Sequence, residues 1–401
     1  MRLLLRRKIL DNLFLIILAI YFYLNLLPAN SIYLSVIPGL RIIFLILLSI
    51  LFSIIYGSAW KRNNKFVFIF ASGFILTNFI CFVTHEELLI PDLQYVIQVV
   101  LIFIFCSLPF KIQIRGFHLI IKVGAFLLFC GIVEFILYTY FGVSYLLVDS
   151  MERGEESTQL YAHGVFNVFQ LGELIPRFQS LFREPGFLGI CSGLFLFKCH
   201  DFSWKISIIW LISGVLSLSL AFYALAFVAL AYHIFITKIL FKPLYLVFIA
   251  VIIVILAVIL WDVLNDAIFL RIQDYLAYGD NRTTVDLDSD LARMFSSSDS
   301  WFGYGYSKFI DCGYAFGNGG IKAELFKYGI VNVCFFFLFF YLLLYAYPFT
   351  ALQKLFLFFL YILCSYNGDA KYAFHIYVIL LSIYQYESLT LNPSNLKSSI
   401  R

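Results

Sequence analysis

Two arginines and a glutamate stand directly before an apolar run in the stretch RFQSLFREPGFLGI, which begins at Arg177. Pro185 fits the first turn of a helix, so the sequence predicts a helix that begins after Glu184. Arg183 would then lie beside the unpaired N–H groups of the helix N-terminus. Guanidinium forks and the helix dipole both favour phosphate there, so the stretch predicts an anion site.

The same charges fit a second interpretation, in which no anion is bound. Arginines are common at the membrane–water interface, where they meet lipid headgroups. Arg177 and Arg183 could equally pair with Glu173 and Glu184 as an ordinary interfacial anchor. Both interpretations stay open on spacing alone.

The elements that position these residues follow from a very apolar composition. Of 401 residues, 62% are hydrophobic, 20% aromatic and only 13% charged, whereas soluble domains are about 45–50% apolar and about 25% charged. Apolar segments of about 20 residues recur along the chain. They predict an all-α polytopic membrane protein with a single transmembrane domain over residues 1–401. The formal charge of +4 does not indicate nucleic acid as a partner.

About twelve apolar segments are long enough, or nearly so, to span a bilayer. They are Ile9–Leu27, Leu40–Ala59, Phe66–Val83, Leu93–Pro109, Phe117–Phe141, Glu184–Phe197, Trp204–Leu218, Ser219–Ile236, Leu244–Asp262, Ala323–Tyr345, Ala351–Ser365 and Tyr372–Tyr386. Most connections between them are short, as in a helical bundle.

Lysine and arginine in the short loops set the predicted orientation, because cytoplasmic flanks carry the positive excess. With the N-terminal MRLLLRRK inside, every second connection is basic. These connections are Lys61–Lys65, Lys111–Arg115, Lys198–Lys205, Thr237–Lys242, the loop around Lys354 and the tail with Lys397 and Arg401. The opposite face receives the acidic segment Thr84–Asp92. Both termini are therefore predicted to be cytoplasmic.

Two long connections fall on the outer face, over residues 142–183 and 265–322. Loops longer than about 12–15 residues in a compact fold are usually functional or disordered. The Tyr, Phe, Trp and Gly content of these two loops argues against disorder. We expect the functional site on this face, where a substrate meets lipid, water or both.

An acidic run in the second loop has an incomplete calcium pattern. DLDSD places Asp286, Asp288 and Asp290 at alternate positions, but Leu291 replaces the required glycine and Ser297 the bidentate glutamate. A solvated acidic turn is predicted instead, and no metal site.

The cysteines also predict no special chemistry. Of 8 cysteines, only Cys312 falls in a long outer loop, so no disulfide framework is expected there. Cys199 and His200 stand together on the inner side without further ligands at zinc spacing, which favours a structural role.

The run WFGYGY contains two glycines, Gly303 and Gly305, without the preceding strand and following helix of a nucleotide site. It predicts a flexible turn. Tyr304 and Tyr306 would present their aromatic faces to sugar rings.

Three stretches resemble the bacterial O-antigen polymerase and ligase superfamily, whose polymerases are the Wzy-type proteins. RFQSLFREPGFLG is similar to the segment that leads into a central membrane helix of the family. DLARMFSSSDSWFGYGY resembles the family's second-loop arginine and W/L-x-G-x-G turn, and YAFGNGGIKAELFKYGIVNV resembles the N-x-x-x-x-x-L-x-x-x-G-I run that opens the next helix. Beyond these stretches the resemblance is one of topology.

Two departures from the family pattern bear on the activity. The family's spacing from arginine to glycine in each long loop is only approximated by Arg177 to Gly189 and by Arg293 to Gly303. The ligase branch carries a histidine in the second loop, whereas residues 262–322 contain none. This absence favours a polymerase and leaves an O-antigen ligase as the alternative enzyme.

The resemblance implies a GT-C-like glycosyltransferase that acts without a cofactor at the periplasmic face of a bacterial inner membrane. It would transfer a glycan from undecaprenyl diphosphate to the terminal hydroxyl of another lipid-linked repeat unit, which makes O-antigen or a related polysaccharide. Membrane lipid and a chain-length regulator are further implied partners. The arginines implied to neutralise the leaving diphosphate are Arg177, Arg183 and Arg293, with Arg271 and Arg282 behind them.

The acceptor hydroxyl would need a general base within hydrogen-bond reach. Glu184 is nearest in sequence, although it could instead hold an arginine in place, and His163 is a weaker candidate. Asn318 and Glu324 are expected to bind sugar hydroxyls or to close the second loop.

A transporter or flippase for a lipid-linked oligosaccharide is the alternative from a different class. Transporters concentrate their charges in broken helices near the midplane, often in two related halves. Here the charges gather in two outer loops and no half-repeat is evident. The sequence therefore favours the enzyme.

Overall fold

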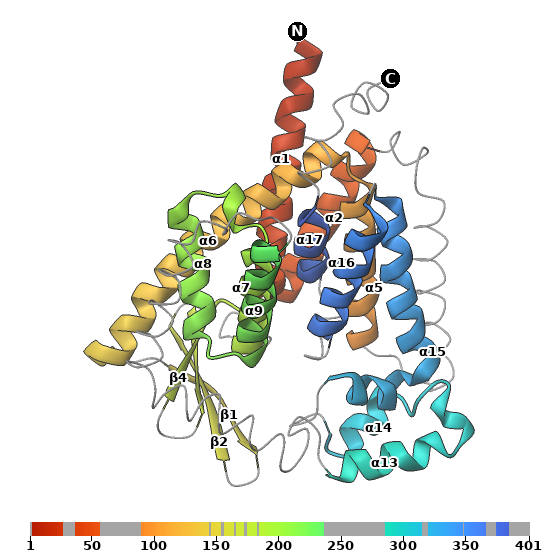
Figure 1. Ribbon diagram of the computed structural model, residues 1–401. Helices are drawn as coiled ribbons and strands as arrows, with labels where there is room; N and C mark the ends of the chain where they lie inside the picture. The colour runs from red at the N-terminus through yellow and green to blue at the C-terminus, as the bar shows by residue number, and fades with distance from the viewer. Residues whose placement is uncertain are drawn as a thin grey trace. The chain divides into compact units, whose positions relative to one another are not determined.

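The computed structural model of the protein (Figure 1) describes residues 2–26, 37–56, 90–143, 146–153, 156–163, 166–171, 175–182, 184–235, 285–314, 320–347, 349–365 and 374–384. This part of the chain is predominantly helical and contains one antiparallel sheet. The predicted spans Phe66–Val83 and Leu244–Asp262 lie outside the described residues, and each of the other predicted spans overlaps a helix.

Two of the described helices are long and apolar enough to cross a membrane. They are α6 (Phe110–Phe141) and α15 (Gly320–Leu343). Several shorter helices in the same part of the chain are equally apolar. The twelve-span topology stays a prediction.

One compact unit comprises Met1–Asn25, Tyr33–Val123 and Arg282–Arg401. Besides α15 and the first part of α6, its described elements are α1 (Arg2–Leu26), α2 (Ile37–Tyr56), α5 (Ile90–Ser107), α13 (Val285–Phe295), η3 (Ser298–Ser300), α14 (Tyr306–Asp311), η4 (Leu344–Ala346), α16 (Ala351–Ser365) and α17 (Phe374–Ser382).

Aromatic side chains hold the helices of this unit together. The rings of Phe340 and Tyr361 stack with their centroids 3.9 Å apart, and the hydroxyls of Tyr361 and Tyr377 lie 2.9 Å apart. These contacts join α15, α16 and α17. The Tyr23 hydroxyl donates to the Ile120 carbonyl at 2.5 Å and joins α1 to α6. Each tyrosine thus buries its ring while its hydroxyl keeps a polar partner.

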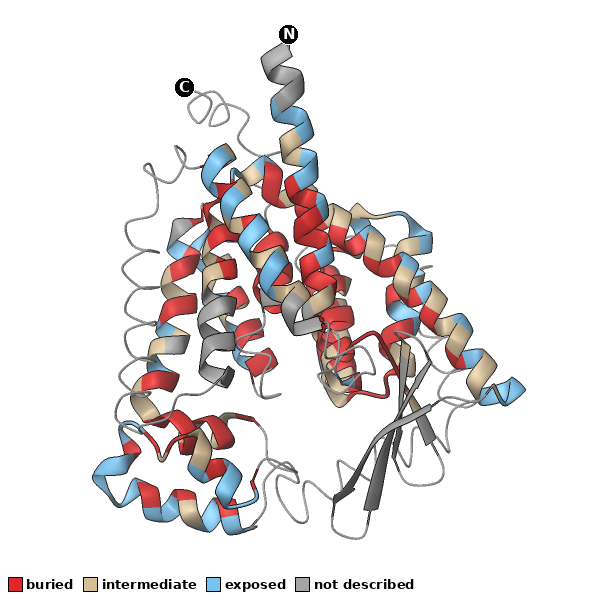
Figure 2. Ribbon diagram, turned by 180° about the vertical axis from the view of Figure 1, so that it is seen from behind, coloured by how far each residue is buried: buried red, intermediate tan, exposed pale blue. Residues whose placement is uncertain are grey.

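Exposed apolar side chains follow helical spacing along several helices. They are Ile9, Leu13, Ile16 and Ile20 on α1; Ile43, Ile46, Ile50 and Ile54 on α2; Phe126, Phe129, Val133 and Ile136 on α6; and Leu352, Leu355, Phe359 and Ile362 on α16. Figure 2 shows exposed, intermediate and buried residues alternating along α1 and α6. Continuous apolar faces of this kind are unfavourable in water and suit a lipid or protein environment.

The second compact unit comprises Leu26–Ile32 and Gly124–Asn281. Besides the end of α6, its described elements are β1 (Leu146–Arg153), β2 (Glu156–His163), β3 (Phe166–Leu171), β4 (Ile175–Ser180), α7 (Pro185–Leu196), η1 (Cys199–Asp201), α8 (Trp204–Leu216) and α9 (Leu220–Phe235).

Two glycines one helical turn apart let α7 pack closely on α9. A Cβ at Gly189 would lie 2.5 Å from the Ser219 Cβ, and one at Gly193 would lie 2.6 Å from the Leu225 Cβ. Small residues at this spacing allow two helix backbones to approach each other.

The first long connection, predicted as a loop, contains four strands among its described residues. Its four strands form an antiparallel sheet in the order β1-β2-β3-β4, and Phe169 of β3 pairs with Arg177 of β4. The sequence carried a signal, because glycines at 154, 164 and 172 directly follow the first three strands. Such spacing is typical of hairpins. The sheet gives Arg177 a rigid frame.

Candidate functional site

The helix after the first outer segment begins where the sequence predicted. Pro185 is its first residue, and Glu184 is the N-cap with an extended backbone (φ −146°, ψ 149°). The Glu184 side chain makes no capping hydrogen bond and is exposed. Its carboxylate is accessible to a ligand.

Arg177 closes the C-terminus of a neighbouring helix. Its guanidinium donates from Nε to the Ser217 carbonyl at 3.2 Å and from Nη2 to the Leu218 carbonyl at 3.3 Å. Ser217 is the C-cap of α8, and Leu218 adopts the left-handed conformation (φ 47°) that commonly ends a helix. A cation there complements the negative end of the helix dipole. Arg177 therefore joins β4 to α8, and its binding of an anion stays a prediction.

Replacing Arg177 by methionine should lower the free energy of unfolding by about 1.5–3 kcal/mol, because two charge-assisted hydrogen bonds are lost. The stability of Arg177→Lys should lie between that of the parent protein and that of Arg177→Met, since one ammonium cannot reproduce the planar fork. Thermal unfolding of the detergent-solubilised protein measures the difference. Equal unfolding temperatures for all three proteins would show that the cap contributes nothing.

The remaining predicted residues divide by what the structure describes. Arg183, Arg271, Arg282 and Asn318 lie outside the described residues. His163 is the last residue of β2, where it pairs with Phe166 of β3. Arg293, Tyr304, Tyr306 and Glu324 fall together in one small lobe of the other unit.

This lobe consists of α13, η3, α14 and the start of α15 up to residue 329. It is called the outer lobe below, after the membrane face predicted for it. Its core contains Leu287, Leu291, Met294, Phe309, Tyr314, Ala323 and Phe326, all buried. In Figure 1 these elements form a compact cluster from which the rest of α15 extends. The described part of the second long connection, residues 285–314, is thus folded rather than loose.

The DLDSD run is the beginning of α13, not the acidic turn that was predicted. Leu287, Leu291 and Met294 recur at helical spacing and bury themselves in the lobe core, which decides the local structure. The Asp288 carboxylate pairs with the Lys322 ammonium at 2.9 Å. The acidic first turn also suits the helix dipole.

The last carboxylate of the run makes two contacts. Asp290 accepts from the Tyr314 hydroxyl at 2.7 Å and pairs with Arg293. Burial, together with the hydrogen bond to Asp290, raises the pKa of Tyr314, which therefore stays protonated. Arg293 keeps three quarters of its side chain exposed (75%), so its guanidinium remains accessible.

The WFGYGY run is not the flexible turn that was predicted. Its backbone packs tightly against the backbone of α15 at Gly329, and this contact is called the glycine interlock below. Gly303 (φ 76°) and Gly329 (φ 73°) lie against each other, and Gly329 breaks α15. A Cβ at Gly303 would lie 2.7 Å from the Gly329 nitrogen, and one at Gly329 would lie 2.5 Å from the Phe302 nitrogen. Neither position has room for a side chain.

Three backbone hydrogen bonds fasten this interlock. Tyr304 donates to the Phe326 carbonyl at 2.7 Å, Gly305 to the Lys327 carbonyl at 3.0 Å, and Val331 to the Trp301 carbonyl at 3.1 Å. They connect residues more than twenty positions apart, which local sequence patterns cannot reveal.

Lys327 was not among the predicted site residues, yet it lies at the centre of the lobe. Its ammonium pairs with the Glu324 carboxylate at 2.5 Å, and both side chains are buried. The ammonium lies 5.0 Å from the ring centre of Phe309 and 5.9 Å from that of Tyr306. Aromatic faces and a carboxylate together compensate a buried cation. The spacing of Glu324 and Lys327 on one helix face was the available signal.

The aromatic faces predicted to stack on sugars already meet lysines. The Lys308 ammonium lies 3.9 Å above the Tyr304 ring, and that of Lys327 faces Tyr306. Both rings are only partly exposed. Any sugar stacking would use their other faces.

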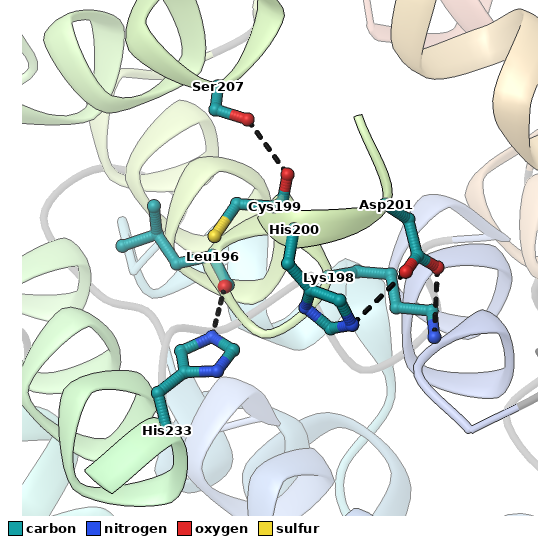
Figure 3. Close-up of polar contacts among 7 residues, drawn as sticks. All are labelled: Leu196, Lys198, Cys199, His200, Asp201, Ser207 and His233. Carbon is teal, nitrogen blue, oxygen red and sulfur yellow. Dashed lines mark hydrogen bonds and ion pairs between the residues drawn. The ribbon is translucent and has the colours of Figure 1, made fainter. Parts of the chain in front are cut away.

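The turn between α7 and α8 contains Cys199 and His200 (Figure 3). His200 Nε2 contacts the Asp201 carboxylate at 3.1 Å, and the Lys198 ammonium lies 3.0 Å from the same group. Burial alone would raise the pKa of Asp201, but these two partners outweigh it and hold that pKa below its usual value. His233 contacts the Leu196 carbonyl at 2.8 Å. The contacts fit the structural role predicted for this turn.

Among the described residues, no group of three or more His, Cys, Asp or Glu side chains could hold a metal ion. Comparison with protein-family models, with curated proteins and with solved structures gave no match to this chain.

Proposed function

We propose that the chain is a membrane glycosyltransferase that polymerises undecaprenyl-diphosphate-linked repeat units into O-antigen or a related polysaccharide at the periplasmic face of a bacterial inner membrane. The observation that supports it most is the folded outer lobe fastened to α15. A lobe fixed at the end of an apolar helix suits a substrate whose lipid lies in the membrane and whose glycan lies in water. It carries an accessible arginine, Arg293.

The proposed reaction breaks the bond between the anomeric carbon of the donor glycan and its diphosphate. The terminal hydroxyl of the acceptor attacks that carbon and gives its proton to a carboxylate, for which Glu184 is exposed and accessible. The leaving diphosphate gains negative charge, which an arginine would stabilise. Arg183 and Arg293 are the two candidates from the sequence. A lipid-linked donor already carries its activating group, so no nucleotide sugar is needed.

Deletion of the gene should leave surface glycan that carries a single repeat unit, because ligation continues while polymerisation stops. Gel analysis of surface polysaccharide measures this. Loss of all glycan from the lipid core would indicate a ligase instead. Accumulation of lipid-linked repeat units on the cytoplasmic side would indicate a flippase.

Arg183→Lys should be nearly as damaging as Arg183→Ala, because lysine keeps the charge but loses the bidentate fork. A lost transition-state contact typically costs around 3–4 kcal/mol, so elongation should fall by roughly a hundredfold or more. Polymer length is measured at matched protein abundance, with exposed Lys205→Ala as the control for removal of one charge. Full-length polymer from Arg183→Lys would return Arg183 to the interfacial-anchor interpretation.

One observation favours a transporter as the second candidate. The break of α15 at Gly329, with buried Glu324 and Lys327 just before it, resembles the interrupted helices of transporters. The charged pair lies on the lobe side of the break, however, and the Lys327 ammonium faces the Phe309 ring of α14. This arrangement favours the enzyme.

A further inference from the structure

Three exposed aromatic side chains gather along one short stretch of the outer lobe. They are Phe295 at the end of α13 and Trp301 and Phe302 directly after η3, with exposed fractions of 49%, 57% and 38%. Arg293 stands at the start of the same stretch with most of its side chain exposed. We call residues 293–302 the aromatic rim.

The backbone of the rim is fixed and does not behave as a loose loop. Ser297 caps η3 by accepting from the Asp299 nitrogen at 3.2 Å, and Ser300 is buried. The Gly303 nitrogen donates to the Asp299 carbonyl at 2.7 Å. The exposed aromatic side chains are therefore presented from a rigid base.

The rim is tied to the first turn of the apolar part of α15. After the break at Gly329, Val331 donates to the Trp301 carbonyl at 3.1 Å. The helix then continues as the apolar run IVNVCFFFLFFYLL up to Leu343. If this run enters the bilayer, the backbone of Trp301 lies level with the point of entry.

We propose that the aromatic rim rests in the outer headgroup layer of the bilayer and fixes the depth of the outer lobe. Tryptophan is enriched at this level, because its ring is apolar while its N–H needs a polar partner. Each headgroup layer is only about 5–8 Å thick, which one side chain can cross from a backbone at the membrane surface. Arg293 can meet a lipid phosphate in the same layer.

This inference needs α15 to cross the membrane but does not need glycosyl transfer, so the two can fail separately. If it holds, the lobe presents Arg293 at the depth where the diphosphate of a lipid-linked substrate lies.

Depth-dependent quenching tests the rim on the full-length protein in phospholipid nanodiscs. A nitroxide quencher is attached to the lipid at the headgroup, near the top of the acyl chain or at its middle. The fluorescence of Trp301 is obtained by subtracting the emission of Trp301→Phe from that of the parent protein. We expect emission at shorter wavelength than that of indole in water. Quenching should be strongest from the two shallow positions and weakest from the chain middle.

A second variant, which adds a signal, keeps the test valid if Trp301→Phe misfolds. Phe302→Trp adds a second fluorophore to the rim, and its added emission should show the same depth profile. Quenching from none of the three depths, with emission like that of indole in water, would overturn the proposal. Strongest quenching from the chain middle would also overturn it.

Discussion

Replacing Gly329 by alanine should unfold the outer lobe. The backbone there has φ 73° and ψ 178°, a region that is essentially restricted to glycine and costs other residues about 1–3 kcal/mol. The new Cβ would also lie 2.5 Å from the Phe302 nitrogen, where only backbone atoms stand in its way. Overpacking of this kind adds about 1–3 kcal/mol. The total is comparable with the whole stability of a small folded unit.

A matched glycine separates steric overlap from backbone strain. Gly313 also has a positive φ of 75°, but no atom lies within 4 Å of a Cβ built there. Gly313→Ala should therefore lower the free energy of unfolding through backbone strain alone, by about 1–2 kcal/mol. Thermal unfolding in detergent compares both variants with the parent protein. Similar unfolding temperatures for Gly329→Ala and Gly313→Ala would show that the interlock is looser than the structure indicates.

The helices could be predicted well from the sequence, because they depend on local patterns. The span Ala351–Ser365 has the bounds of α16, and the helix start at Pro185 was set by the identity of a single residue. Hydropathy and proline chemistry act over one or two helical turns.

The sheet and α13 carried signals that stronger patterns obscured. Glycines after the first three strands marked the hairpins, and the spacing of Leu287, Leu291 and Met294 marked the helix. The alternate aspartates of DLDSD predicted a solvated acidic turn, whereas the apolar residues at helical spacing within and after the run bury themselves in the lobe core. Exposed carboxylates stay hydrated in a helix as well as in a turn, so they do not favour either structure. Burial of the apolar side chains therefore decides that the segment is helical.

The contacts of the candidate site could not be predicted because they join distant segments. Arg177 binds carbonyls forty residues further along the chain. The glycine interlock likewise joins residues more than twenty positions apart. Nothing in the types of Gly303 and Gly329 says that they meet. Only the packing of the lobe core brings them together.

Breaking the buried pair of the outer lobe should destabilise it as strongly as the glycine substitution. Lys327→Met leaves the Glu324 carboxylate buried without the ammonium that now lies 2.5 Å away. Removal of one partner from a buried pair typically costs about 3–5 kcal/mol, since the remaining charge has lost its compensation. Glu324→Gln should also destabilise the lobe, because the amide can still accept a hydrogen bond but no longer supplies the negative charge that compensates the buried Lys327 ammonium.

An exposed pair on the same lobe provides the control for this experiment. Lys322 and Asp288 lie 2.9 Å apart, but about half of each side chain is exposed (42% and 45%). Lys322→Met should therefore cost at most about 1 kcal/mol. The double variant Glu324→Leu with Lys327→Met removes both buried charges, so it should be more stable than either single variant. Unfolding measurements on the parent protein, Glu324→Leu, Lys327→Met and the double variant give the coupling between the two charges. If Lys327→Met costs no more than Lys322→Met, water reaches the pair and the lobe is more open than its burial implies.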